Sequence, residues 1–287
     1  MKFSVSSYSF SQYFRKGILE QKDAVCKAKE LGFDAVEFTD LQPTGNLSAE
    51  QYAKEIREEC EKNKLPVSSY SVGADFLKSD VRETVEELKK KVDIAHILGA
   101  PFLRHDVMYQ FPHERGGWRA AALKISNAIR EVSEYAHSKG IKTMVENHGF
   151  VMQDADRVEY LINEVNHPNF GWLCDMGNFL CADEKPEICC GKAAPYVFYV
   201  HAKDFIVKDG KGADPGEGFF QSRGGNYLRG TIIGHGVVPV MQCLRVLKNN
   251  GFDGYVSVEF EGIEDCMLGI RIGLDNLKKY LSNIENK

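Results

Sequence analysis

Four short apolar segments in the second half of the chain each end in a residue that can bind a metal ion or carry a proton. They read MVENHG, WLCDMGN, YVHAKD and VSVEFEG, and the residues concerned are Glu146, Asp175, His201 and Glu259. One such residue alone is typical of a solvated strand end. Three carboxylates and an imidazole that share one place repel one another unless a cation neutralises them. Oxygen-rich ligation with one nitrogen suits Mn²⁺ best, with Mg²⁺, Co²⁺ and Zn²⁺ as alternatives, so we predict a site for one divalent metal ion.

Two further polar residues lie next to these ligands in the sequence. Lys203 follows His201 by two positions, so the two side chains point the same way on an extended strand. His148 follows Glu146 with the same spacing. We predict a catalytic role for both. The alternatives are an ion pair with Asp204 for Lys203 and a supporting hydrogen bond for His148.

Substrate contacts are predicted from several parts of the chain. The candidates are His105, Asn178, Glu37, Tyr8, Arg229 and His235. For His105, the alternative is a buried histidine whose hydrogen bonds are made within the protein. Arg229, together with Arg223, can grip a phosphate or carboxylate, and the alternative for this pair is anchoring of its own loop.

One pattern recurs along the chain and must position these residues. It consists of an amphipathic helix, a glycine, two or three linking residues and a short strand rich in Val, Phe and Tyr. Gly32, Gly99, Gly140 and Gly251 stand where a helix needs a left-handed last residue. The spacing of apolar residues predicts a helix over 81–98.

Eight strands are expected, each followed by a helix. Their predicted bounds are Phe3–Phe10, Ala35–Thr39, Pro66–Val72, Phe102–Val107, Thr143–Asn147, Gly171–Asp175, Val197–Lys203 and Tyr255–Phe260. This order predicts a (β/α)₈ barrel, a single catalytic domain over residues 1–287, with the site at the carboxyl ends of the strands. A doubly wound sheet is disfavoured because no glycine-rich turn follows the first strand. The long, glycine-rich connection 205–238 is expected to be a functional loop without regular structure.

Composition narrows the class of partner. The chain has 287 residues, 36 basic against 41 acidic side chains and a formal charge of −5, which disfavours a sequence-independent grip on nucleic acid. The N-terminal segment alternates polar and apolar residues, unlike a signal peptide, and no apolar run is long enough for a membrane helix. The eight scattered cysteines are expected to be free, buried thiols, and His113 and His137 to be surface residues. We predict a cytoplasmic protein that acts on a small molecule, with no nucleic acid or membrane partner.

The strand-end motifs resemble a known superfamily. V-E-N-H at the fifth strand, C-D-M-G-N at the sixth, V-H-A-K-D at the seventh and V-E-F-E-G at the eighth are similar to the xylose isomerase-like barrels of sugar isomerases and epimerases. The segments I-G-H-G and N-G-F-D-G-Y also match, and the resemblance covers essentially the whole chain. It implies one divalent ion on the four predicted ligands, with Glu146 and Glu259 exchanging a proton with the substrate from opposite faces, as in the ketose 3-epimerase branch. It also suggests a homodimer or homotetramer.

Two positions depart from that branch. Asn178 stands where the epimerases carry a histidine, and His235 stands where many relatives carry an acid. The multi-metal DNA-repair members of the superfamily need additional ligands, and Asn178, Leu228 and Gly230 fall near those positions. The resemblance therefore favours a sugar-processing enzyme over a DNA-repair enzyme.

The implied chemistry also makes sense from the residues themselves. A divalent ion beside the carbonyl of a keto sugar would acidify the neighbouring C–H, and a carboxylate on each side can remove and return that proton. We therefore predict a metal-dependent isomerase or epimerase of a keto sugar or sugar phosphate. The first alternative is a dehydratase or lyase of a keto-inositol, keto-sugar or keto-glycoside, with His148, His105 or His235 as the acid. The second alternative is a non-catalytic sugar-binding subunit.

Overall fold

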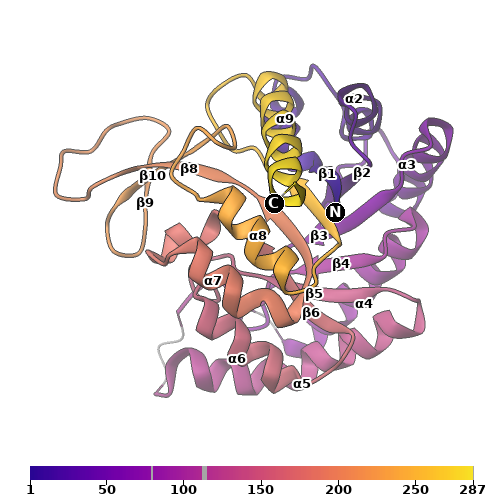
Figure 1. Ribbon diagram of the computed structural model, residues 1–287. Coiled ribbons are helices and arrows are strands. Elements are labelled where there is room, and N and C mark those ends of the chain that lie inside the picture. Colours follow the sequence, from indigo (N-terminus) through magenta and orange to yellow (C-terminus); the bar gives the residue numbers. More distant parts are fainter. Residues whose placement is uncertain (79, 112–114, 287) are drawn as a thin grey trace.

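Eight short, almost wholly buried parallel strands close into a barrel at the centre of the computed structural model, which describes residues 1–78, 80–111 and 115–286 (Figure 1). In order around the barrel they are β1 (Lys2–Ser6), β11 (Tyr255–Val258), β7 (Val197–Ala202), β6 (Phe170–Asp175), β5 (Lys142–Glu146), β4 (Phe102–His105), β3 (Val67–Val72) and β2 (Ala35–Thr39). The predicted (β/α)₈ barrel is confirmed. The strands read as continuous apolar runs because side chains cover both of their faces.

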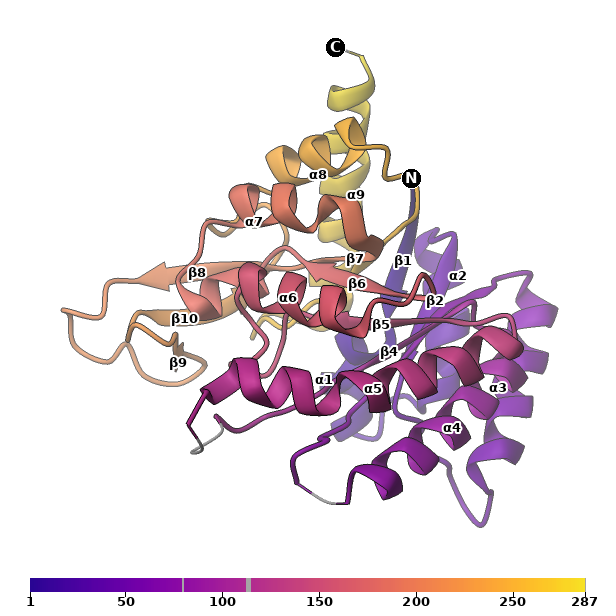
Figure 2. The same cartoon turned by 90° about the horizontal axis from the view of Figure 1, so that it is seen from below.

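Helices surround the barrel (Figures 1 and 2). They are α1 (Ser11–Arg15), α2 (Ala24–Leu31), α3 (Ala49–Asn63), α4 (Val81–Leu98), α5 (Gly117–Ser138), α6 (Ala155–Val165), α7 (Pro186–Ala193), α8 (Val240–Asn249) and α9 (Cys266–Glu285). None of the helices that the structure describes is both long and apolar enough to cross a membrane.

The bounds of α4 agree with the prediction and have a local cause at each end. The Asp80 carboxylate accepts the backbone N–H of Arg82 at 2.9 Å, which caps the first turn. Gly99 ends the helix with φ of 71°, a conformation that favours glycine. The other three predicted glycines also have positive φ.

The predicted surface and thiol positions agree with the structure where it describes them. His137 is exposed, and His113 lies outside the described residues. The eight cysteines are free, and all but Cys26 are buried.

The first strand is shorter than predicted. β1 ends at Ser6, and Ser7–Phe10 forms the 3₁₀ helix η1 in place of a continued strand. The Ser6 hydroxyl accepts the backbone N–H of Tyr8 at 3.3 Å, so a local side-chain hydrogen bond replaces the strand ladder. This turn carries Tyr8 onto the carboxyl end of the barrel.

The prediction of a structureless connection over 205–238 is wrong. A three-stranded antiparallel sheet of order β8-β10-β9 fills much of it, formed by β8 (Asp204–Lys208), β10 (Tyr227–Thr231) and β9 (Phe220–Gln221). Asp204 pairs with Thr231 and Lys208 with Tyr227. The sheet projects away from the barrel in both views (Figures 1 and 2). Its many glycines lie mostly in the turns between the strands, which is why composition alone suggested a loop.

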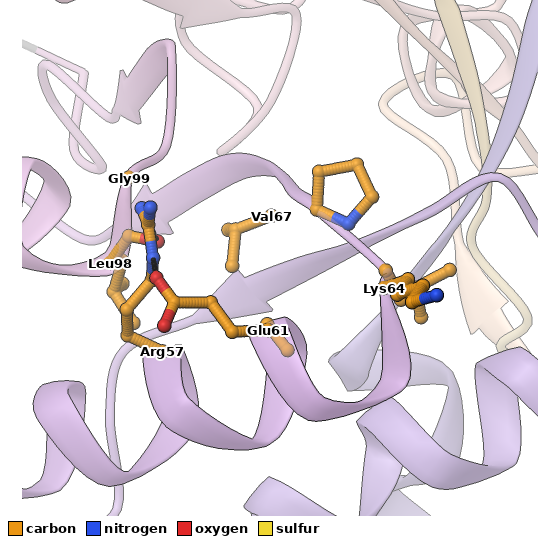
Figure 3. Close-up of a pocket in the computed structure, with 9 residues that line it drawn as sticks. Arg57, Glu61, Lys64, Val67, Leu98 and Gly99 are labelled. Carbon is orange, nitrogen blue, oxygen red and sulfur yellow. Dashed lines mark hydrogen bonds and ion pairs between the residues drawn. The ribbon is translucent and has the colours of Figure 1, made fainter.

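A pocket of about 330 Å³ lies at the opposite end of the barrel, between the last turns of α3 and α4 and the start of β3 (Figure 3). Two of its charged side chains, Arg57 and Glu61, are paired with each other. Arg57 Nε lies 2.6 Å from Glu61 Oε1, and Arg57 Nη1 donates to the Leu98 carbonyl at 3.4 Å. In this fold the amino-terminal end of the strands serves stability, and the pocket lies beside that end, away from the predicted ligands.

The buried carboxylate of Asp204 holds the projecting sheet to the barrel. Its Oδ1 accepts the backbone N–H groups of Phe205 and Val238 at 2.9 and 3.0 Å. Its Oδ2 accepts those of Gly234 and Gly236 at 2.8 and 2.9 Å. One side chain therefore fixes both ends of the long connection.

We expect Asp204→Ala to lower the free energy of unfolding by about 3 kcal/mol, because buried N–H groups lose their acceptor. Urea denaturation measures this change. Asp214→Ala is the matched control, since its carboxylate caps only the exposed Gly216 N–H. Equal, small effects of the two substitutions would contradict the anchoring role of Asp204.

Candidate metal centre

The four predicted ligands meet at the carboxyl end of the barrel. Glu146, Asp175 and His201 lie on β5, β6 and β7, and Glu259 directly follows β11. One ligand atom from each lies within 4.8 Å of the others. His201 Nδ1 is 3.6 Å from Glu146 Oε1, 3.8 Å from Asp175 Oδ2 and 3.5 Å from Glu259 Oε1. These strands are neighbours in the barrel, so their ends converge as the sequence predicted.

Two buried atoms of this cluster lack a hydrogen-bond partner. They are Asp175 Oδ2 and His201 Nδ1, both of which face the other ligands. Leaving a buried polar atom unpaired is unfavourable by roughly 1–3 kcal/mol, and such atoms in a native site call for a specific explanation. Three carboxylates and one imidazole nitrogen are a donor set that a divalent ion accepts. The residues therefore fit a metal ion, and the four form a candidate metal site.

His201 is oriented by Glu37. Its Nε2 lies 2.8 Å from Glu37 Oε2, and Ser71 Oγ donates to Glu37 Oε1 at 2.7 Å. An Nε2–H directed at a carboxylate leaves the Nδ1 lone pair for the cluster. Burial opposes protonation of His201, but Glu37 and Glu259 outweigh it and raise its pKa. Glu37, predicted to contact substrate, thus lies behind a ligand, fully buried.

Two buried cations balance the carboxylates. Lys203 Nζ lies 2.5 Å from Glu259 Oε2 and 3.3 Å from both Asp175 Oδ2 and Glu261 Oε2. Lys203 thus points into the site, while the neighbouring Asp204 binds backbone N–H groups. Arg104 Nη2 lies 2.7 Å from Glu146 Oε2. Burial alone raises the pKa of a carboxyl group, and here it raises that of Asp175 to about 7.

Sequence analysis did not select Arg104 as a site residue. It precedes His105 on β4, and side chains of consecutive strand residues point to opposite faces. Arg104 therefore faces the barrel interior and His105 faces outward. The alternation of side-chain directions along β4 could have identified Arg104, because an arginine next to the end of a buried strand needs a carboxylate partner.

Asp106 links Arg104 to His148. Its Oδ1 lies 2.9 Å from Arg104 Nη2 and 2.8 Å from His148 Nδ1, and Tyr109 donates its hydroxyl to Oδ2 at 2.7 Å. Burial opposes protonation of His148, but the Asp106 carboxylate outweighs it and raises the pKa of the imidazole. The other ring nitrogen is free to face the cavity. His148 is therefore both supported from behind and open to a ligand.

A cavity of about 280 Å³ opens onto the ligands. It is lined by Tyr8, Thr39, Asp40, Gln42, Ser71, Val72, Gly73, Arg104, Glu146, His148, His201, Lys203, Glu259 and Glu261. Tyr8 donates its hydroxyl to Glu261 at 2.9 Å, and burial raises the pKa of this phenol. Asn178 lies beside the ligands and connects Glu146 to Lys203, donating to Glu146 Oε1 at 3.0 Å and accepting from Lys203 at 3.2 Å.

Of the six predicted substrate contacts, only Tyr8 lines this cavity. Glu37 lies behind His201 and Asn178 beside the ligands, and the other three lie elsewhere. His105 is fully buried outside the barrel interior, stacked on Phe170 at 5.9 Å, with Nδ1 2.9 Å from the Asp106 carbonyl. Arg229 Nη2 lies 3.2 Å from Glu264, which corresponds to the loop-anchoring alternative. His235 is exposed at the base of the projecting sheet.

The chain belongs to the xylose isomerase-like TIM-barrel family, whose model matches residues 25–280. Among curated relatives, an inosose dehydratase of Bacillus thuringiensis (strain Al Hakam) is 23% identical over 227 residues, 72% of each chain. A crystal structure of IOLI protein with a bound zinc atom superposes with a TM-score of 0.76 and 17% identity, covering 99% of this chain and 98% of that one. An L-ribulose 3-epimerase structure gives a TM-score of 0.71 and 16% identity, over 99% and 96% of the chains.

We expect Glu37→Gln to weaken Mn²⁺ binding about 10–100-fold. The substitution removes the carboxylate that orients His201 and leaves all four predicted ligand residues in place. Isothermal titration with MnCl₂ measures the affinity. Asp40→Asn is the control, since it removes the same charge from an acid that lines the cavity and pairs with Lys91. If both variants lost affinity equally, general charge and not ligand orientation would be responsible.

A second prediction concerns acid stability. Burial lowers the pKa of His105 to about 4 from its ordinary 6.5, so the unfolded chain binds more protons than the native one between these values. The contribution of neutral His105 to the free energy of unfolding is fully present above pH 6.5. It falls by about 3 kcal/mol as the pH drops to 4. Urea unfolding across this range with EDTA measures the slope. We expect His105→Phe to flatten it, and an unchanged slope would refute the assignment.

Proposed function

We propose that the protein is a divalent-metal-dependent isomerase or epimerase of a keto sugar, free or phosphorylated, with Mn²⁺ as the preferred ion. The observation that carries this proposal is the convergence of three carboxylates and His201 at the carboxyl end of the barrel. Within this cluster His201 Nδ1 has no hydrogen-bond partner, and Asp175 Oδ2 has only the ion pair with Lys203 at 3.3 Å. Membership of the xylose isomerase-like family and the likeness to an epimerase fold support it.

Glu146 and Glu259 would hold the ion together with Asp175 and His201, and the bound ion would supply Lewis acidity that weakens a C–H bond beside the sugar carbonyl. Glu146 and Glu259 come from strands separated by two others, so they approach the cavity from different sides. Each has a cation within 2.7 Å, Arg104 for the first and Lys203 for the second. Each carboxylate can therefore stay ionised, ready to take a proton from carbon, and two such bases allow inversion.

The supporting residues hold the sugar and its oxygens. Lys203 Nζ contacts Glu259, Asp175, Glu261 and Asn178, and would exchange one of these partners for a substrate oxygen. Tyr8 lines the same cavity beside Glu261. Asn178 fixes the relative positions of Glu146 and Lys203. The carboxylates and cations thus form a preorganised polar wall. This wall would face the part of the substrate on which negative charge develops during proton removal.

A dehydratase or lyase is the second candidate, and one observation favours it. The pair of Asp106 and His148 places an acid at the cavity edge, apart from the ligands. A glutamate would take the proton from the carbon next to the carbonyl, the C–H electrons would form a C=C bond, and the C–O bond at the β carbon would break. The departing oxygen would take a proton from His148. The similarity to inosose dehydratase supports this candidate.

We expect Glu146→Gln and Glu259→Gln each to lower turnover at least about 100-fold while changing substrate binding far less, because each removes a proton carrier. Proton NMR of Mn²⁺-loaded protein with keto sugars and inososes in D₂O measures turnover, with Mn²⁺ occupancy determined on the same samples. Deuterium in an intact sugar supports the isomerase, and loss of water supports the dehydratase.

Glu261→Gln is the matched control for these variants, since this acid lines the cavity without belonging to the ligand cluster. Its turnover should stay within about tenfold of the parent. Equal, modest losses in all three variants would contradict the assignment of Glu146 and Glu259 as bases. Absence of both deuterium exchange and water loss, with metal bound, would favour a non-catalytic sugar-binding protein.

A further inference from the structure

A second cavity of about 420 Å³ opens beside the metal-facing cavity. We call it the aromatic lobe; it is lined by Tyr109, His148, Gly149, Phe150, Gln153, Asn178, Cys181, Lys203, Phe205, Phe220 and Glu261. Three residues, His148, Lys203 and Glu261, line both cavities. The aromatic lobe is therefore continuous with the candidate metal centre and belongs to the same opening.

The walls of the aromatic lobe come from aromatic rings that remain partly in solvent. Phe150, in the loop after β5, is 42% exposed, and Phe220 on β9 is 37% exposed. Phe205 forms the buried floor and meets Phe220 edge to face at 5.8 Å between ring centres. Scattered exposed apolar residues need no explanation, but rings that converge on one cavity next to a polar centre are typical of a ligand site.

The position of Phe150 is fixed by its backbone. Its φ of 64° is uncommon for a residue with a side chain, and its N–H donates to Gln153 Oε1 at 2.8 Å. Its carbonyl accepts a hydrogen bond from Arg223, which also pairs with Asp154 at 2.6 Å. Arg223 therefore anchors a loop, and that loop holds Phe150 at the lobe.

Gln153 and Tyr109 in the aromatic lobe already use their polar groups within the protein. The other polar lining residues include His148, Lys203 and Glu261, which also line the metal-facing cavity. Gln153 Nε2 donates to the carbonyls of Asn147 and Asn178, and its Oε1 is taken by Phe150. Tyr109 donates its hydroxyl to Asp106. A second sugar ring would bring hydroxyl groups that need partners, whereas a flat apolar group needs only surface contact.

We propose that the substrate is a sugar that carries an aromatic substituent, as in an aryl glycoside, and that the aromatic lobe binds this substituent while the metal-facing cavity binds the sugar. The sugar half of this inference rests on the proposed function; the aromatic half rests on the lobe. The metal-facing cavity alone lies at the small end of ligand sites, near 300 Å³, and the adjoining lobe extends it to the size that a two-part ligand requires.

Matched pairs of phenyl and methyl β-glycosides of glucose, galactose and mannose test the lobe by equilibrium titration of the Mn²⁺-loaded protein. These ligands lack a carbonyl, so the proposed proton transfer cannot consume them during the measurement. We expect the phenyl member of at least one pair to bind about tenfold or more tightly than its methyl partner, the gain typical of burying a phenyl ring.

Phe220→Ala and Phe150→Ala should each remove most of this preference and leave binding of the methyl glycoside within about twofold. Leu123→Ala is the control, because Leu123 on α5 is 51% exposed and lines neither cavity. Circular dichroism checks that the variants stay folded. Should one lobe variant fail to fold, the other still tests the lobe.

The outcomes separate this inference from the proposed function. Equal affinities within every pair, no binding of any pair, or a preference that survives both lobe substitutions would overturn the aromatic lobe as a substrate site. Mn²⁺ binding and deuterium exchange with simple keto sugars would still stand in that case. A phenyl preference that depends on Phe220 in a protein that binds no Mn²⁺ would uphold the lobe and refute the proposed function.

Discussion

Buried like charge at the carboxyl end of the barrel is the constraint on which the rest of the site depends. Glu146 and Asp175 are buried and face the largely buried Glu259, and such a group is stable only when positive charge is held among them. Arg104 and Lys203 supply part of this charge from opposite sides of the cluster. His201 Nδ1, which has no hydrogen-bond partner, faces the three carboxylates of this candidate metal site.

The register of the barrel turns this electrostatic requirement into geometry. Asp175 pairs directly with His201, and His201 pairs with Ser257, two residues before Glu259. Because side chains alternate along a strand, a shift of one residue in any of these pairings would turn a ligand toward the helices. The same alternation separates Arg104, which faces the ligands, from His105, which lies among aromatic rings. Strand pairing and ligand geometry are thus one property of the fold.

Much of this arrangement could be predicted from the sequence, for a physical reason. The spacing of apolar residues and the positions of glycines predict the helices and strands. Because parallel strands in a barrel bring their carboxyl ends together, Glu146 and Asp175 could be placed without coordinates. The 3₁₀ turn at Tyr8 and the sheet within 205–238 escaped prediction because local hydrogen bonds and long-range pairing, not composition, decide them. The orienting role of Glu37 depends on a contact across 164 positions, which no local pattern encodes.

The attachment at Asp204 lets the projecting sheet vary separately from the barrel. The carboxylate that immediately follows Lys203 binds backbone N–H groups at both ends of the long connection, and ion pairs of Arg223 with Asp154 and of Arg229 with Glu264 add to this attachment. The sheet itself projects away from the barrel (Figures 1 and 2). Residues 210–217 are all exposed, so they can change in length and composition while the candidate metal centre keeps its shape. Directed evolution of new selectivity can start from the projecting sheet and leave the residues of the barrel unchanged.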